Sequence, residues 1–337
     1  MSVHRFRDVF AALVIALSMA ALASAAPVQM NLVTKITLPG KGGHGDWVAF
    51  DPGANKVYVA LHGSGVAVVD AATNKVTATV DPIKGPNGIA FDGSYVYAAA
   101  GDSNELVVIS KSDWKIVNRV QTKGKTPDGV WVDSARGTVL VSSDDNNWVE
   151  VYTAGTSPQL KATYHLLPEK PKSGPDVGVL VAQKGALYMP VDSYVEAIGL
   201  ANGKLQGHPM DTHVPLTKNG GTKNMVYDPK TNTLWVGTTA KKVLILNADT
   251  LRIIRSVPAH GGIDEVSMDP NLRLVYTFES SARGFDVYAL DGTKPVAYVN
   301  TGSGNTHTGD VDPKTHYVYV FMGDANVLAV YTPAGMH

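Results

Sequence analysis

Trp47-Val48-Ala49-Phe50-Asp51 is the stretch that decides the fold of this chain. Its apolar residues run for the length of a short strand and close on an aspartate, which is typical of a β-strand that ends in a turn. The pattern returns at intervals of about 40 residues, a period that indicates four-stranded propeller blades rather than helical repeats. The other six copies are Gly88-Ile89-Ala90-Phe91-Asp92, Gly129-Val130-Trp131-Val132-Asp133, Gly178-Val179-Leu180-Val181-Ala182, Asn224-Met225-Val226-Tyr227-Asp228, Glu265-Val266-Ser267-Met268-Asp269 and Thr308-Gly309-Asp310-Val311-Asp312.

Each repeat divides into four predicted strands, because short clusters rich in Gly, Pro, Asn and Asp interrupt the alternating segments. In the first repeat the inner strand is predicted over 47–51, the second over 56–61, the third over 65–70 and the outermost over 75–80. The sequence therefore predicts an all-β protein, a seven-bladed β-propeller with four-stranded blades.

The last repeat lacks an outermost strand, since the chain ends soon after the segment 327–331. A spare strand lies at the other end, over 31–38, and its residues 33–38 resemble the outermost strand 75–80 of the first repeat. We expect this N-terminal strand to complete the seventh blade, which closes the ring and removes an exposed sheet edge.

Several of these motifs resemble the YVTN family of seven-bladed propellers, which includes YncE-like exported proteins. The resemblance extends over residues 26–337, although the full Tyr-Val-Thr-Asn word is missing, with Tyr58-Val59-Ala60-Leu61 in its place. It implies a propeller fold and export, and it specifies no activity because one fold supports many functions. The motifs that carry it are Val57-Tyr58-Val59, Val275-Tyr276-Thr277, Val68-Val69-Asp70-Ala71-Ala72-Thr73-Asn74, Pro86-Asn87-Gly88 and Pro127-Asp128-Gly129.

The first residues are predicted to be an export signal. Arg5 and Arg7 precede an apolar run over about 9–23, and a small-residue cleavage site follows. We therefore expect a signal peptide over 1–25, a single propeller domain over 26–337, and a periplasmic or secreted protein.

The composition excludes several classes of function. The chain has no cysteine, which rules out thiolate metal sites, iron-sulfur clusters and c-type haem. Its 29 basic and 30 acidic residues give no basic patch for nucleic acid, and no apolar run is long enough for a confident membrane span. We expect a monomer whose partner is a small molecule, a metal ion or a periplasmic protein.

Histidines gather in the loops expected on one face of the propeller, here called the top face. It carries the loops between blades and those between second and third strands. His44, His260 and His307 each lie just before an inner strand, in the neighbouring blades one, six and seven. Imidazoles bind Zn, Cu or Fe, so these three are predicted to hold a divalent metal, with carboxylates as a fourth ligand or as support for the imidazoles. The carboxylate candidates are Asp46, Asp264, Glu265 and Asp310.

A second constellation consists of oxygen ligands at the entry to the central funnel. Such groups suit Ca²⁺ or Mg²⁺, and the residue types are similar to those of the six-bladed calcium-dependent lactonases and esterases of the gluconolactonase and paraoxonase type. Trp47 is a candidate for stacking on a ligand at the rim. The oxygen candidates are Asn87, Asp128, Asp176, Asn224, and Asp264 or Glu265.

Three hypotheses of function are open at this point. The first is an exported propeller that binds a ligand, with a metal ion, in the top funnel. A second is a metal-dependent hydrolase, lactonase or lyase that uses the same funnel. The third is a metal-free protein-interaction module, in which the histidines are ordinary solvated loop residues and the Asn and Asp residues are turn formers.

Overall fold

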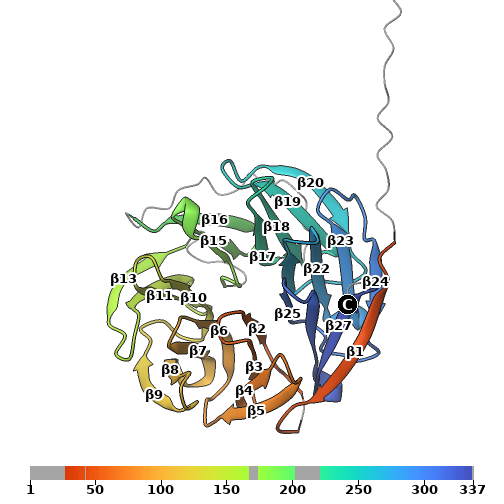
Figure 1. The fold of residues 1–337 in the computed structure, drawn as a ribbon. Helices are drawn as coiled ribbons and strands as arrows, with labels where there is room; N and C mark the ends of the chain where they lie inside the picture. The colour runs from red at the N-terminus through yellow and green to blue at the C-terminus, as the bar shows by residue number, and fades with distance from the viewer. Residues whose placement is uncertain (1–26, 42, 167–173, 202–220, 336–337) are drawn as a thin grey trace, which may run out of the picture.

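The computed structural model describes residues 27–41, 43–166, 174–201 and 221–335. Seven antiparallel sheets stand around a central axis, so the fold is the predicted seven-bladed β-propeller (Figure 1). The predicted signal peptide lies outside the described residues. No helix in the described part of the chain is long and apolar enough to cross a bilayer.

Each blade begins with a strand at the axis and moves outward strand by strand. The inner strands are β2 (Trp47–Asp51), β6 (Pro86–Phe91), β10 (Pro127–Asp133), β14 (Val179–Val181), β17 (Thr222–Asp228), β21 (Glu265–Asp269) and β25 (Gly309–Asp312). The second strands are β3 (Lys56–Leu61), β7 (Tyr95–Ala100), β11 (Thr138–Ser143), β15 (Ala186–Val191), β18 (Thr233–Thr238), β22 (Leu274–Glu279) and β26 (Tyr317–Met322).

The third strands are β4 (Gly65–Asp70), β8 (Glu105–Ser110), β12 (Trp148–Thr153), β16 (Tyr194–Gly199), β19 (Lys242–Asn247), β23 (Gly284–Ala289) and β27 (Val327–Pro333). The outer strands are β5 (Lys75–Val80), β9 (Ile116–Gln121), β13 (Leu160–His165), β20 (Ile253–Pro258), β24 (Ala297–Asn300) and β1 (Met30–Thr37). Short 3-10 turns are η1 (Gly101–Ser103), η2 (Ala182–Lys184), η3 (Ser280–Ala282) and η4 (Gly323–Ala325).

The fourth blade shows three strands, β14, β15 and β16, among the described residues. The segment between β16 and the next inner strand includes residues 202–220, which lie outside the description together with His208 and His213. The other six blades have the four strands that the repeat predicts.

The N-terminal strand closes the ring, as predicted. β1 pairs antiparallel with β27, and Ile36 stands opposite Leu328 in the register. The sheet order β1-β27-β26-β25 therefore joins the two ends of the described chain in one blade, which Figure 1 shows as red and blue strands side by side.

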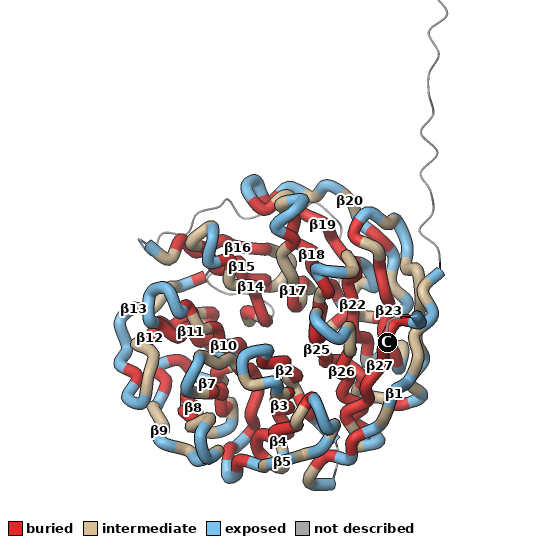
Figure 2. Tube along the Cα trace, viewed as in Figure 1, coloured by how far each residue is buried: buried red, intermediate tan, exposed pale blue. Residues whose placement is uncertain are grey.

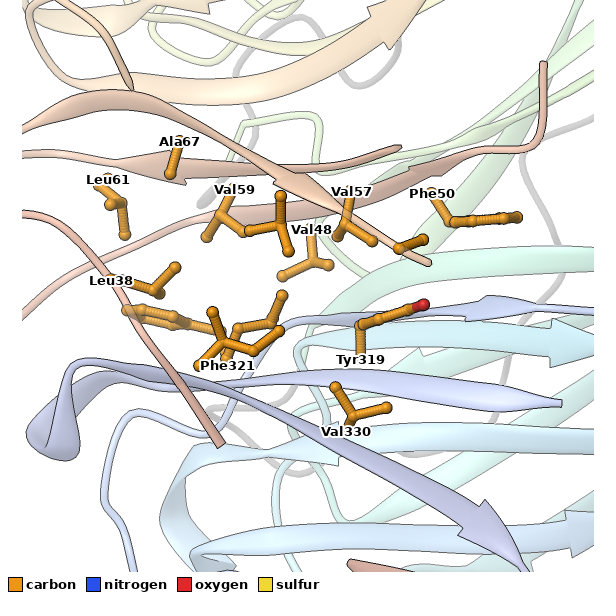
Figure 3. Close-up of a cluster of buried hydrophobic side chains, with 14 residues drawn as sticks. Leu38, Val48, Phe50, Val57, Val59, Leu61, Ala67, Tyr319, Phe321 and Val330 are labelled. Atoms are coloured by element: carbon orange, nitrogen blue, oxygen red, sulfur yellow. The ribbon is translucent and has the colours of Figure 1, made fainter. Parts of the chain in front are cut away.

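Apolar side chains fill the spaces between neighbouring blades rather than one central core. Seven buried clusters each join two adjacent sheets, and the tube in Figure 2 is mostly red along the inner strands. Figure 3 shows the cluster at the closure, where Phe50 of β2 faces Tyr319 of β26. Because each blade is buried on both faces, its strands are apolar at most positions instead of strictly alternating.

Candidate functional site

Three side chains from two loops of blade one meet on the top face. His44 Nε2 lies 2.6 Å from Asp46 Oδ1, and His62 Nε2 lies 2.7 Å from Asp46 Oδ2. The imidazoles of His44 and His62 stand edge to face, with their ring centres 4.5 Å apart. Asp46 thus uses both carboxylate oxygens to hold two imidazoles.

His307 reaches the same carboxylate from blade seven. Its Nε2 lies 3.8 Å from Asp46 Oδ1, beyond hydrogen-bond distance, and its ring centre is 5.2 Å from that of His44. The side chain is only 5% exposed, and Nε2 has no hydrogen-bond partner. An unpartnered polar atom in a buried position costs free energy, which makes this nitrogen a candidate ligand atom.

Local backbone contacts bring these three loops together. The Val48 N–H donates to Thr308 Oγ1 at 2.9 Å, which fixes the segment after His307 against β2. Gly43 N–H donates to Gly323 O at 3.1 Å and joins the loops of blades one and seven. A side chain at Gly45 would have its Cβ 2.8 Å from Ala60 O and 2.8 Å from the Phe321 ring, so the loop needs glycine there.

The carboxylate of Asp46 is strongly held in its ionised form. Burial opposes ionisation, but contacts with the three imidazoles outweigh burial and keep the pKa of Asp46 well below its usual range. In return, the hydrogen bond to Asp46 raises the pKa of His44 against the opposing effect of burial.

The donor set suits a metal ion. One ligand atom each from His44, Asp46 and His307 lie within 4.8 Å of one another, which makes them the metal-compatible group found among the described residues. His62 adjoins this group through Asp46. Imidazole nitrogens with a carboxylate are the ligands of Zn and Fe sites in proteins, so the residues present fit the divalent metal that the sequence predicts.

His260, predicted to converge with His44 and His307, is not part of this group. Its Nδ1 lies 2.6 Å from Asp286 Oδ1, and its ring stacks on Tyr298 at 4.3 Å. Asp286 and Tyr298 belong to the outer half of blade six, β23 and β24, and they draw the imidazole away from the axis. The expected three-histidine convergence is therefore corrected: the third imidazole at the carboxylate is His62.

Asn87 and Asn224, predicted as ligands, make hydrogen bonds between neighbouring blades. Asn87 Nδ2 donates to Pro127 O at 3.0 Å, while its Oδ1 lies 2.9 Å from His62 Nε2. Asn224 Oδ1 accepts from the Val266 N–H at 3.2 Å. Asn87 is thus a support for His62, and Asn224 ties blade five to blade six.

Four other predicted carboxylates form a second wall of the funnel, here called the acid wall, made of Asp128, Asp176, Asp264 and Glu265. Lys223 Nζ lies 2.6 Å from Asp176 Oδ2 and 3.3 Å from Asp264 Oδ1. Burial, with repulsion from neighbouring carboxylates, raises the pKa of Asp128, Asp176 and Glu265. Asp46 contributes to this repulsion at Asp128 and Glu265, so its charge acts on the acid wall as well as on the histidines.

Trp47, predicted to stack on a ligand, lies across the mouth of the central channel. Its indole packs against the cluster between blades one and two and also against the cluster between blades three and four. The channel has a volume of about 590 Å³, and Trp47, Asn224 and Glu265 are among its lining residues. Trp47 therefore contributes an aromatic surface to a channel that polar side chains also line.

His62 is the site residue that sequence reasoning left out of its ligand set. It lies in the loop between β3 and β4 rather than before an inner strand. The sequence did place His62 near His44, because its loop is predicted on the top face of the same blade. What the sequence does not show is that the His62 N–H donates to His44 O at 3.2 Å and brings the two loops into contact.

No family model matches this chain, and no curated protein matches it. Among solved structures it is similar to a Kuenenia stuttgartiensis hydrazine synthase chain, with a TM-score of 0.75 and 16% sequence identity. The match covers 89% of this chain and 98% of that one. At this identity the similarity supports the propeller fold alone.

Proposed function

We propose that this protein is an exported propeller that binds a divalent transition-metal ion in its top funnel through His44, Asp46, His62 and His307. The observation that carries the proposal is the Nε2 atom of His307, which is buried, unpartnered and 3.8 Å from a carboxylate oxygen. A metal ion between these atoms would satisfy the nitrogen and neutralise the carboxylate.

The ligand set favours Zn, Cu or Fe over Ca²⁺, because three of its four donors are imidazoles. A metal held this way supplies a Lewis acid at the mouth of the funnel. Asn87 supports the arrangement by accepting a hydrogen bond from His62, and it is itself anchored on Pro127 O. In the metal-bound form Asn87 would stay beside the site as a nearby oxygen donor.

Among the described residues, the site is exposed to solvent on the side of His44. His307 is buried beneath it, whereas the His44 side chain is 54% exposed at the rim. A ligand would therefore arrive from the solvent side of the funnel, between His44 and the acid wall. Residues 1–25 fit an export signal, and we propose that metal and ligand are met outside the cytoplasm.

The test is elemental analysis of the purified exported protein with substitutions at five histidines. We expect about one metal ion per chain in the wild type and near-complete loss in His44→Ala and His307→Ala, because removal of one ligand costs much of the affinity. His62→Ala should bind the metal at least about tenfold more weakly, because it loses either a ligand or a residue that supports one. The controls, His165→Ala and His260→Ala, should keep the metal.

Two results would overturn the proposal. One is a wild-type protein that stays substoichiometric after titration with Zn²⁺, Cu²⁺ and Fe²⁺. The other is an equal loss of metal in His260→Ala and His307→Ala, which would restore the histidine set predicted from sequence.

A further inference from the structure

We propose that His260 is a nucleophilic imidazole that accepts the acyl group of small activated esters, with Asp286 as its positioning residue. His260 lies in the loop between β20 of blade five and β21 of blade six, one of the blade-to-blade loops of the top face. It shares no residue with the proposed metal site. The inference therefore goes beyond the proposed function and does not depend on it.

Asp286 fixes the imidazole through two contacts. Its Oδ1 lies 2.6 Å from His260 Nδ1, and its Oδ2 accepts from the His260 backbone N–H at 2.9 Å. An ionised carboxylate only accepts hydrogen bonds, so Nδ1 carries a hydrogen and the lone pair of the neutral ring lies on Nε2. Nε2 is therefore the nitrogen that an acyl group would reach.

The carboxylate that holds the ring is itself held in place. Asp286 is a fully buried residue of β23, and Tyr288 OH donates to its Oδ2 at 3.2 Å. Burial, together with Asp286, raises the pKa of Glu279 to about 9, so Glu279 carries the proton of this carboxyl pair near neutrality. Asp286 is thus the ionised member, able to orient the imidazole and to offset a positive charge on it.

Tyr298 sets the plane of the imidazole from one side. The two rings stack with their centres 4.3 Å apart and their planes 22° apart. The His260 side chain is nevertheless 52% exposed, and among the described residues no hydrogen bond is made by its Nε2. A solvent-exposed ring held by a buried carboxylate is the arrangement of a nucleophile or base that a third group orients.

Two other described histidines each lack part of this arrangement. His316 Nδ1 also contacts a buried carboxylate, that of Asp269 at 2.7 Å, but the side chain is only 21% exposed. His165 is exposed, and its ring stands edge to face against Trp148 with no carboxylate contact in the described part of the chain. His260 combines the oriented ring with exposure.

The reaction requires only the ester and water. The Nε2 lone pair attacks the carbonyl carbon, the bond from that carbon to the ester oxygen breaks, and the leaving group departs with the electron pair. The acylated ring carries a positive charge that Asp286 offsets through Nδ1–H. Water then attacks the acyl carbon, the carbon–nitrogen bond breaks with its electrons returning to Nε2, and the acid gives its proton to solvent. The ester must have a good leaving group, such as an aryl oxide, because the imidazole is otherwise expelled first.

The experiment uses p-nitrophenyl acetate and the full-length exported protein treated with a chelator. Nitrophenolate release gives the rate, and mass spectrometry of rapidly quenched samples maps the acetyl group. We expect acetylation at His260 and a rate at least about tenfold lower in His260→Ala. The matched control His165→Ala, at an exposed histidine without a carboxylate, should keep the rate. His44→Ala, at an exposed histidine of the proposed metal site, should keep it too.

Asp286→Asn tests the positioning role. An amide can also donate to the ring and so allows the other tautomer, which should lower the rate at least about tenfold. The nitrogen NMR spectrum of the His260 ring supplies a readout that a merely structural role would not change. It should show an unprotonated Nε2 in the wild type and a mixture of tautomers in Asp286→Asn. Urea denaturation checks that each variant is folded, and His260→Ala decides the inference if Asp286→Asn is not.

Three results would overturn the inference. They are an unchanged rate in His260→Ala, acetyl groups spread equally over the exposed histidines, and a rate that is lost in His44→Ala but kept in His260→Ala. The last would assign the ester hydrolysis to the proposed metal site. Because the assay uses chelator-treated protein, a wild type that binds no metal would leave the prediction for His260 unaffected.

Discussion

At the scale of the residue, the aspartate that closes six of the seven repeated stretches is a turn builder. Asp51 Oδ1 accepts from the Gly53 and Ala54 N–H groups, and Oδ2 accepts from Tyr58 OH at 3.0 Å. Asp92 repeats the pattern with Ser94, Tyr95 and Tyr97 in blade two. These carboxylates hold the turn between first and second strands, on the face opposite the candidate site, which explains why the repeat predicts fold better than function.

Asp51→Ala tests this role. The side chain is 2% exposed and also pairs with Lys111 Nζ of blade two at 2.5 Å. We expect a loss of about 2–4 kcal/mol in the free energy of unfolding, because three donors and a buried cation lose their partner. Urea denaturation measures it. Asp113→Ala, which removes an exposed pair with Lys115, should leave stability nearly unchanged.

A second residue-scale prediction concerns the buried carboxyl pair of Glu279 and Asp286. Burial, together with Asp286, raises the pKa of Glu279 to about 9. Between pH 4.5, the ordinary pKa of this carboxyl group, and about pH 9, Glu279 is protonated in the folded state and ionised in the unfolded state. Stability therefore falls as pH rises through this window, by at most about 1.4 kcal/mol per pH unit for this group.

Glu279→Gln should flatten that decline, since an amide cannot ionise. The measurement is a set of urea titrations from about pH 5 to about pH 8.5. Glu105→Gln, at a partly exposed carboxylate paired with Arg119, is the matched control and should leave the slope unchanged. Equal slopes in wild type and Glu279→Gln would contradict the prediction.

At the scale of the element, β1 carries the closure of the ring. Ile36 is buried among Leu328 and Val330 of β27, whereas Val33 lies at a register shift and is 39% exposed. The two residues share one strand and differ in burial. The strand was predictable because its alternation matches the outer strand of blade one.

Ile36→Ala should therefore lower the free energy of unfolding by about 2–4 kcal/mol, the cost of a cavity in a packed cluster. Val33→Ala should lower it by less than about 1 kcal/mol. Thermal and urea denaturation measure both. Comparable losses in the two variants would show that strand pairing, rather than packing against β27, supplies the closure.

At the scale of the whole molecule, metal binding should be linked to stability, because the ligands come from blades one and seven, the two that the closure joins. Zn²⁺ at about a hundredfold excess over its dissociation constant should add about 2.7 kcal/mol to the free energy of unfolding. The gain should disappear in His307→Ala and persist in His165→Ala. A gain of equal size in His307→Ala would show that the metal binds at another site.

The number of blades, the bounds of the first blade's strands and the closing role of the N-terminal strand follow from the sequence alone. The predicted strands 47–51, 56–61, 65–70 and 75–80 match β2 to β5. These features depend on short-range patterns, because side-chain alternation and turn residues each involve only a few neighbouring positions. Their repetition along the chain makes the blades recognisable.

Which side chains meet depends on tertiary packing. His44, Asp46 and His307 were in the predicted ligand set, but His260 turns to Asp286 and His62 takes its place at Asp46. Contacts such as Val48 with Thr308, 260 residues apart in the chain, set these directions. A side chain's direction depends on what packs around its loop, and no local pattern in the sequence encodes that.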